Sequence, residues 1–260
     1  MFLEERKTQI LDFIIRDYIR HGLPVSSGRV HKETDIEAGP ATIRHIMGEL
    51  DENGFLEQPH VSGGRVPTDK AYRYFVNYLM RIEESGGADK TVKEINGGDS
   101  FEEMNPVRNP CGEWRSSHEL LSVITRAAEQ WGIISNGMNK TISEATKLFT
   151  IMADFGRKKQ LNFYGVQRLL DEPEFADGEL LYNFAGLFDN LYEIADIYRR
   201  RINEETIFIG KENPLKETRM MSVVGGKIKN REKNAVLLII GPRRMNYEYN
   251  CSILRYFFEK

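Results

Sequence analysis

The sequence predicts an α+β protein whose two domains are joined by a linker. Three observations predict it. Apolar residues recur at helical spacing, with one hairpin-like interruption, over residues 1–82. Glycine and proline breakers replace this periodicity over residues 83–115, which we expect to be a flexible linker. Residues 116–260 then mix amphipathic helical stretches with short runs that are rich in β-branched residues.

The composition is that of an ordinary globular chain. Of its 260 residues, 40% are hydrophobic and 29% are charged, and the formal net charge is −3. The longest clean apolar run, Ala235 to Ile240, is too short to span a bilayer, and the charged N-terminus is not expected to be a signal peptide. Because Cys111 and Cys251 allow no disulfide framework and no zinc ligand set, we expect a reducing, cytoplasmic location, and the short apolar runs predict no contact with a membrane.

Three helices are expected near the N-terminus. Serine can cap the second helix, and proline starts the third, since its missing N–H would be unpaired at a first helical position. A glycine follows the first and the third helix, as is common at helix ends. The expected bounds are Glu5–Arg20 before Gly22, Ser26 or Ser27 to about Asp35, and Pro40 to about Asn53 before Gly54.

A short hairpin and a fourth helix complete this domain. Phe55–Glu57 has the pattern of a strand, Pro59–Arg65 is a turn-rich tip, and Val66 resumes an extended path. Thr68 can cap the helix that follows. Helix, helix, helix, strand, tip, strand, helix is the order of a winged helix-turn-helix domain. The inward residues of the fourth helix are expected to be Tyr72, Phe75, Val76 and Leu79.

The second domain is expected to combine helices with four strands. Its helical stretches are His118–Trp131, Ser143–Phe155, Gly178–Arg201 and Cys251–Phe258. Its strands are Gln160–Tyr164, Thr206–Ile209, Met220–Val224 and Ala235–Ile240. The helix over 178–201 carries an apolar stripe that fits either its own core or a dimer seam. That stripe consists of Leu181, Phe184, Leu187, Leu191, Ile194 and Ile197.

The third helix has the pattern of a recognition helix. Its apolar stripe of Ile43, Ile46, Met47 and Leu50 faces a core, which leaves the N-terminal residues of the opposite side for base edges in the major groove. A small alanine or a threonine methyl suits a thymine methyl, and an arginine suits a guanine or a phosphate. The alternative is that this side is a solvated surface.

The hairpin tip and the fourth helix add positions that suit phosphate contacts. The tip carries one cation, and helix N-terminal amides can hold a phosphate. The alternative for the glycines of the tip is simple turn geometry. The candidate DNA-binding residues are Ser27, Pro40, Ala41, Thr42, Arg44, His45, His60, Ser62, Gly63, Arg65, Thr68, Lys70 and Arg73.

Enzymatic chemistry is not indicated. No histidine has metal-ligand spacing with a cysteine or an aspartate, so we expect no metal site and no cofactor. Glu172 and Glu174 flank Pro173 and fit a helix start better than an acid–base pair. The region around Lys227 lacks the order of a phosphate-binding loop. We therefore assign no catalytic residue.

The chain resembles the heat-inducible transcription repressor family, HrcA. Several ungapped pieces agree in order over about the first eighty residues, and three more agree later. The early pieces are Pro24–Ser27, Pro40–Arg44, Pro59–Thr68 and Tyr72–Arg73. The later pieces are Leu170–Phe175, Ile209–Gly210 with Glu212–Asn213, and Gly241–Tyr247.

The resemblance implies a repressor that binds an inverted-repeat operator of double-stranded DNA ahead of chaperone genes. It implies a homodimer with a winged helix, a GAF-like domain and a helical dimerising insertion, and a chaperonin as co-regulator. The sequence departs from the family at Gly39, where serine is common, and at His45, where asparagine is common. The region before Gln160 is also short, so we expect an abbreviated GAF-like domain.

Two other functions stay open at this point. The near-neutral charge of the N-terminal domain suits a winged-helix module that binds a protein partner, because nucleic-acid binders commonly carry a basic excess. The C-terminal domain could also act as a small-molecule sensor.

Overall fold

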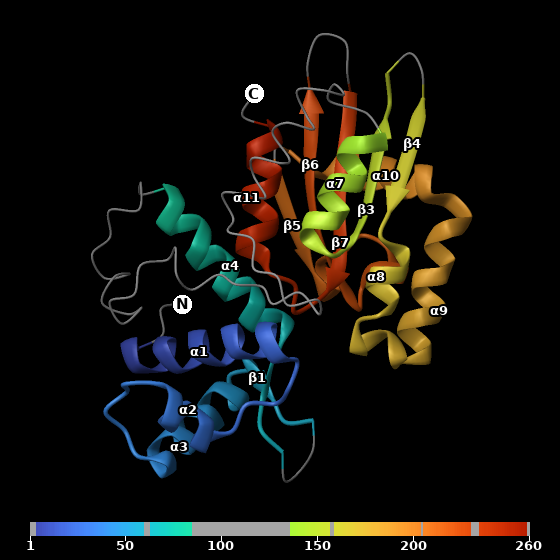
Figure 1. Cartoon of the computed structure of the whole chain (residues 1–260). Helices are drawn as coiled ribbons and strands as arrows, with labels where there is room; N and C mark the ends of the chain where they lie inside the picture. The colour runs from blue at the N-terminus through green and yellow to red at the C-terminus, as the bar shows by residue number, and fades with distance from the viewer. Residues whose placement is uncertain are drawn as a thin grey trace. The chain divides into compact units, whose positions relative to one another are not determined.

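The computed structural model describes residues 4–59, 63–84, 136–156, 159–203, 205–229 and 234–258. The chain divides into two compact units, residues 1–114 and 115–260, and each is described by itself. The N-terminal unit holds helices α1 to α4 with a small hairpin, and the C-terminal unit holds a five-stranded sheet with helices on both faces (Figure 1).

The three N-terminal helices form where their start and stop residues predict. Helix α1 spans Glu5–His21, α2 spans Ser27–Glu33 and α3 spans Pro40–Glu52. Gly22 ends α1 in the left-handed conformation, at a φ of 66°, and its N–H donates to the carbonyl of Tyr18. The hydroxyl of Ser26 accepts from the N–H of Arg29 at 3.2 Å and caps α2.

A hairpin and a fourth helix follow, as the sequence predicts. Strand β1 (Leu56–Glu57) pairs antiparallel with β2 (Val66–Pro67), and α4 spans Asp69–Glu84. An isolated bridge between Val25 and Arg65 adds a third extended segment, which the sequence did not predict. The order confirms the winged helix-turn-helix. Its core is formed by apolar side chains of all four helices and the hairpin, among them Ile10, Ile14, Val30, Ile43, Leu50, Phe55 and Tyr72.

The C-terminal unit is built on an antiparallel sheet of order β4-β3-β7-β6-β5. The first two strands along the chain therefore form one half of the sheet and the last three form the other, joined where β3 pairs with β7 and Ile151 lies opposite Leu238. The strand bounds are β3 Phe149–Asp154, β4 Gln160–Tyr164, β5 Glu205–Ile209, β6 Met221–Lys229 and β7 Asn234–Pro242.

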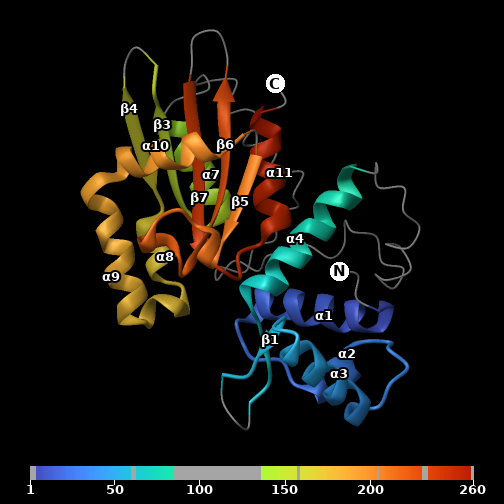
Figure 2. The ribbon, with the colours of Figure 1, turned by 180° about the vertical axis from the view of Figure 1, so that it is seen from behind.

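Helices cover both faces of this sheet, as the two opposite views show (Figures 1 and 2). On one face α7 (Asn136–Thr146) lies against β3 and β4, and α11 (Tyr247–Phe258) lies against β5 and β6. On the other face α10 (Leu191–Arg201) packs on β3, β6 and β7. Central strands buried on both faces explain why β7 is apolar along nearly its whole length.

The predicted helix over Ser143–Phe155 is wrong. Helix α7 ends at Thr146, and residues 149–154 form the central strand β3. A strand that is buried on both faces has a continuous apolar sequence, and such a run cannot be distinguished from a buried helix by periodicity.

The single helix predicted over Gly178–Arg201 is also wrong. The segment forms α9 (Gly178–Gly186), a 3₁₀ turn (Leu187–Asn190) and α10. Four residues of the predicted stripe are buried in the core of the unit, namely Phe184, Leu187, Leu191 and Ile194. In α9, Leu180 is buried in place of Leu181, which is 43% exposed. Two short elements precede this segment. Helix α8 (Val166–Leu170) was not predicted, whereas the 3₁₀ helix at Pro173–Ala176 begins at Pro173, where the sequence predicts a helix start.

The fold class is α+β, as predicted, with helices and an antiparallel sheet mixed in the C-terminal unit. The other predicted strands are present, and β6 and β7 are longer than predicted. The expected linker lies outside the described residues except for its first two positions, which belong to α4. The expected helix over His118–Trp131 also lies outside them.

Candidate nucleic-acid interface

Helix α3 separates an apolar side from an exposed side. Ile43, Ile46, Met47 and Leu50 are buried, as the helical wheel predicts. The first two turns on the opposite side expose four side chains that lie close together because they are three and four positions apart. These four, Ala41, Thr42, Arg44 and His45, are called the reading quartet below.

The start of α3 is uncapped by any side chain. Gly39 occupies the N-cap position with no side-chain hydrogen bond, and Pro40 follows it in the first turn. No heavy atom lies within 4 Å of the position that a β-carbon of Gly39 would occupy, so the backbone here is open. An uncapped N-terminus with an exposed first turn suits the approach of an anion or a base edge.

His45 and Glu49 form an ion-pair geometry beside the reading quartet. His45 is 78% exposed, and its Nε2 lies 3.7 Å from Oε1 of Glu49 one turn later. Lys7 of α1 places its Nζ 3.1 Å from Oε2 of the same carboxylate. The hydrogen bond that Lys7 donates to Glu49 raises the pKa of Lys7, against an opposing contribution from desolvation. Glu49 is therefore partly neutralised by Lys7, which reduces its repulsion of a phosphate.

The wing is fastened to the far end of α3. The Nε of Arg65 donates to Oδ2 of Asp51 at 2.8 Å, and the Arg65 backbone bonds Val25 in both directions at 2.9 Å. A β-carbon on Gly64 would lie 2.5 Å from the carbonyl carbon and oxygen of Val25. Only glycine therefore fits at position 64. The requirement for glycine at position 64 comes from close packing against the backbone of Val25 and not from turn geometry alone.

Thr68 and Lys70 contact the segment that directly follows α3. The hydroxyl of Thr68 donates toward the carbonyls of Gly54 and Phe55 at 2.7 and 3.1 Å. The Nζ of Lys70 donates to the carbonyl of Asn53 at 2.6 Å and lies 4.4 Å from the centre of the Phe55 ring. Lys70 is exposed and has two further donors. It can hold a phosphate without leaving Asn53.

The structure brings together only part of the predicted set. The reading quartet shares one surface with Pro40, whereas Ser27 is buried in the first turn of α2. Gly63 is exposed and its carbonyl accepts from Gln58, and Arg73 is half-buried on α4. His60 and Ser62 lie outside the described residues.

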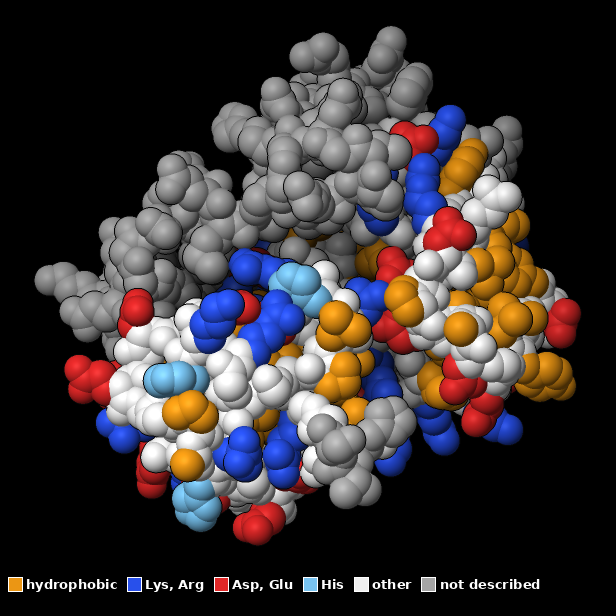
Figure 3. Space-filling model, turned by 60° about the horizontal axis from the view of Figure 1, so that its bottom comes forward, with side chains coloured by type: hydrophobic (Ala, Val, Ile, Leu, Met, Phe, Trp, Pro, Cys, Tyr) orange, Lys and Arg blue, Asp and Glu red, His pale blue; other side chains and the backbone are white. Residues whose placement is uncertain are grey.

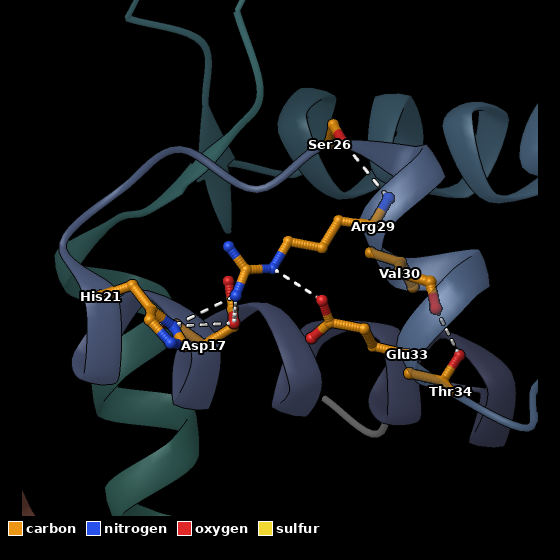
Figure 4. A network of polar contacts seen from close by, with 7 residues as sticks. All are labelled: Asp17, His21, Ser26, Arg29, Val30, Glu33 and Thr34. Atoms are coloured by element: carbon orange, nitrogen blue, oxygen red, sulfur yellow. Dashed lines mark hydrogen bonds and ion pairs between the residues drawn. The ribbon is translucent and has the colours of Figure 1, made fainter.

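Sequence reasoning missed a buried ion pair between α1 and α2 (Figure 4). Asp17 is 5% exposed, and its Oδ1 lies 2.7 Å from an Nη2 of Arg29 and 3.0 Å from Nδ1 of His21. A signal for it was present. Asp17 falls on the same helical stripe as Ile10 and Ile14, where a carboxylate is buried unless the stripe ends there.

The charge on this end of the N-terminal unit is mixed. Figure 3 shows Lys, Arg and His side chains scattered among uncharged ones there, with most Asp and Glu side chains toward the edge. Three arginines of the unit's described residues pair with carboxylates: Arg16 with Asp12, Arg29 with Asp17 and Arg65 with Asp51. Arg44 is exposed at the centre of the reading quartet. Since several arginines are engaged by carboxylates, the positions of the cationic side chains matter more for DNA binding than their number.

Two polar clusters stabilise the C-terminal unit. Arg244 donates to Glu172 and Glu174, so the Gly241–Tyr247 segment is tied to the Leu170–Phe175 segment. The hydroxyl of the buried Tyr198 donates to Oδ1 of Asn213 at 2.7 Å and lies 2.8 Å from the hydroxyl of Thr218. Burial raises the pKa of Tyr198 far above its ordinary value. These contacts stabilise the fold and show no arrangement for catalysis.

Metal-ligating side chains do not gather anywhere in the part of the chain that the structure describes. In the same residues, no helix combines the length and the apolar character needed to cross a membrane.

A family model described as the HrcA protein C-terminal domain matches residues 112–249, more than half of the chain. Curated relatives match nearly the whole length. The heat-inducible transcription repressor HrcA of Thermodesulfovibrio yellowstonii is 26% identical, with 95% of this chain and 93% of the relative covered. That of Thermoanaerobacter sp. (strain X514) is 27% identical, with 95% and 92% covered. That of Desulfitobacterium hafniense is 23% identical, with 98% and 96% covered.

The alignment with the Thermodesulfovibrio protein runs over 329 residues, although this chain has 260. The chain therefore spans its relative with internal deletions. Among solved structures, a crystal structure of a hypothetical protein superposes with a TM-score of 0.67 at 18% identity, covering 99% of this chain and 97% of the other. This similarity supports the overall fold.

Proposed function

The chain belongs to the HrcA family of heat-inducible transcription repressors, and from this premise we propose that the reading quartet of α3 recognises its operator. The protein is a DNA-binding repressor of heat-shock transcription. The finer assignment concerns which residues meet the bases. It is supported by the exposed first turns of α3, with the apolar stripe tucked behind them.

The quartet offers three kinds of base contact. Ala41 and the methyl of Thr42 suit a thymine methyl, and Arg44 suits the two acceptors of a guanine. His45 donates or accepts at a base edge according to its tautomer. The acidic residues Asp51 and Glu52 at the end of α3 favour entry by the N-terminal end of the helix alone.

Phosphate contacts are assigned to the wing and the start of α4. Lys70 has two donors left after its bond to Asn53, and Arg73 lies one turn further along α4. Gly63 with His60 and Ser62 would supply backbone or short polar contacts from the tip. Such contacts position the protein without specifying sequence. Arg65 serves mainly to hold the wing, because its guanidinium is engaged by Asp51.

A homodimer on an inverted repeat is the geometry we propose for the complex. A two-fold operator is matched by a two-fold protein, with half-sites about one helical turn apart or a multiple of it. We further propose the chaperonin as co-regulator and the cytoplasm as location, since a repressor acts on the chromosome. The protein is assigned as a regulator and not as an enzyme.

Selection of binding sites from random duplexes tests the proposal directly. We expect an inverted repeat to emerge, and a mass in solution that corresponds to a dimer. Arg44→Ala combined with His45→Ala should bind selected and scrambled duplexes equally. Wild-type protein that binds scrambled duplex as tightly as any selected sequence would refute the proposal. Adding chaperonin to aged repressor should restore binding if the chaperonin is a co-regulator.

One observation favours a second function, a winged-helix module that binds a protein. Arg16, Arg29 and Arg65 of the N-terminal unit each pair with a carboxylate, which lowers the attraction of the unit for a polyanion. A protein partner recovered by pull-down, together with no duplex binding at low salt, would favour this alternative.

A further inference from the structure

Asp17 and Arg29 form the polar link between α1 and α2 (Figure 4). The carboxylate of Asp17 is 5% exposed, and its Oδ1 receives Nη2 of Arg29 at 2.7 Å. Arg29 also approaches Glu33, with Nε to Oε1 at 3.4 Å, but Glu33 lies on the same helix. The cross-helix contacts of Arg29 are therefore the ion pair with Asp17 and a longer contact with His21, in which Nη2 and Nδ1 are 3.3 Å apart.

The packing of α2 makes this link important. Helix α2 has seven residues, and it packs chiefly on α3 and only lightly on α1. Ser27 and Val30 are its buried residues. Because α2 is short and contributes few apolar contacts, its angle to α1 is not fixed by hydrophobic packing alone. Since α2 packs chiefly on α3, which itself packs on α1, the link adds to the contacts that set how the reading quartet projects from the rest of the unit.

The charges of the pair argue against a phosphate contact by Arg29. Its Nη2 is directed to a buried carboxylate, and that carboxylate sits on the side of α1 that faces the interior. A buried carboxylate that loses its partner is strongly unfavourable, so Arg29 cannot leave Asp17 cheaply to bind DNA.

We propose that Asp17 and Arg29 are positioning residues for DNA recognition, which hold the α2–α3 pair at the angle that the operator requires. The inference rests on the proposed function. It assigns neither residue to the DNA. Its consequence is that losing the pair lowers the fraction of molecules in the binding-competent arrangement, and the apparent affinity falls by the same factor.

The direction in which one substitution changes the affinity for DNA distinguishes this positioning role from a simple effect of charge. Asp17→Asn removes a negative charge from a DNA-binding unit, so charge alone would tighten binding. The positioning role instead weakens binding to the selected duplex, by about tenfold if about a tenth of the molecules stay competent. Asp12→Asn is the matched control. Asp12 lies on the same helix and pairs with Arg16 within that helix at 2.8 Å, so the same charge is removed without breaking a cross-helix link.

Arg29 gives a second test that does not depend on the Asp17 variant folding. Arg29→Met should lose affinity while the slope of log K against log salt stays unchanged, because no phosphate contact is lost. A true phosphate contact would instead reduce the slope by about 0.9. Arg29→Lys should recover part of the affinity, since an ammonium restores the charge but not the forked geometry. Thermal melts of each variant give the native fraction at the temperature of the binding assay.

The outcomes distinguish a failure of the proposed DNA-binding function from a failure of the positioning role. Failure of the wild-type protein to bind any duplex would refute the proposed function. Wild-type binding with Asp17→Asn equal to or tighter than Asp12→Asn, in folded protein, would overturn the positioning role alone. So would an Arg29→Met variant that binds as wild type or loses about 0.9 of the salt slope.

Discussion

Arg65 in the wing and Asp51 in the last turn of α3 form an ion pair, with Nε and Oδ2 2.8 Å apart. The side chains are 18% and 33% exposed, so the pair is shielded from solvent only in part. It joins the two elements that we propose to act together on DNA. The basic residue of the tip is thus used first to hold the wing.

A double-mutant cycle of Arg65→Ala and Asp51→Ala should show coupling. We expect a coupling energy of about 1 kcal/mol, at the upper end of the range for exposed pairs, because both groups are partly buried. Urea unfolding of the two single variants and the double variant measures it. Strictly additive losses would mean that the pair does not stabilise the wing.

Gly64→Ala should destabilise the N-terminal unit by about 2 kcal/mol, because the new methyl would meet the backbone of Val25 at 2.5 Å. The control is Gly48→Ala on α3, where no atom lies within 4 Å of the added β-carbon. That variant should gain about 0.5–1 kcal/mol from helix propensity. Denaturant midpoints of both variants provide the comparison, and similar midpoints would contradict the close approach of wing and Val25.

Lys70 and Arg44 should differ in what their loss changes. Lys70→Ala should weaken binding to all duplexes alike and reduce the salt slope by about 0.9, as for a phosphate contact. Arg44→Ala should cost about 1–3 kcal/mol against the selected duplex and relax the preference at one position. Titrations at several salt concentrations with selected and scrambled duplexes measure both. A salt slope unchanged by Lys70→Ala would place Lys70 off the DNA.

Arg244→Ala should destabilise the C-terminal unit by about 2 kcal/mol. The substitution leaves the carboxylates of Glu172 and Glu174 without their cation. The expected loss is smaller than for a fully buried ion pair, because the Arg244 side chain is 14% exposed. Arg200→Ala is the control, because Arg200 is 73% exposed and shares Asp196 with Arg199. Thermal unfolding of both variants tests the difference. Equal melting temperatures would show that the Arg244 cluster adds nothing.

Tyr198→Phe should cost about 1–3 kcal/mol at neutral pH, because Asn213 would keep a buried oxygen without its donor. Burial raises the pKa of Tyr198 in the folded state above the unfolded value of 10.0. The stability that this group contributes is therefore complete below pH of about 10 and falls as the pH rises further. The wild-type protein should lose more stability above pH 10 than the phenylalanine variant. Tyr182→Phe, at an 81% exposed site, should change neither measurement.

The N-terminal unit could be predicted almost completely from sequence, because its signals are local. Pro40 begins α3, Gly22 ends α1, and the stripe from Ile43 to Leu50 defines which side of α3 is buried. The reading quartet follows from that stripe alone. The C-terminal unit was less predictable, since β3 and the break at Leu187 depend on burial from both sides and on chain direction.

The sequence by itself determined the order of elements in the N-terminal unit, the family, and the exposed side of α3, because helix caps and apolar spacing act within a few residues. The tertiary structure alone decided which residues distant in the sequence come into contact. Asp17 pairs with Arg29, Asp51 pairs with Arg65, and Gly64 packs on Val25 only after the chain has folded. These partners are separated by twelve to thirty-nine positions. Their pairing depends on the angles between packed helices, which no local pattern specifies.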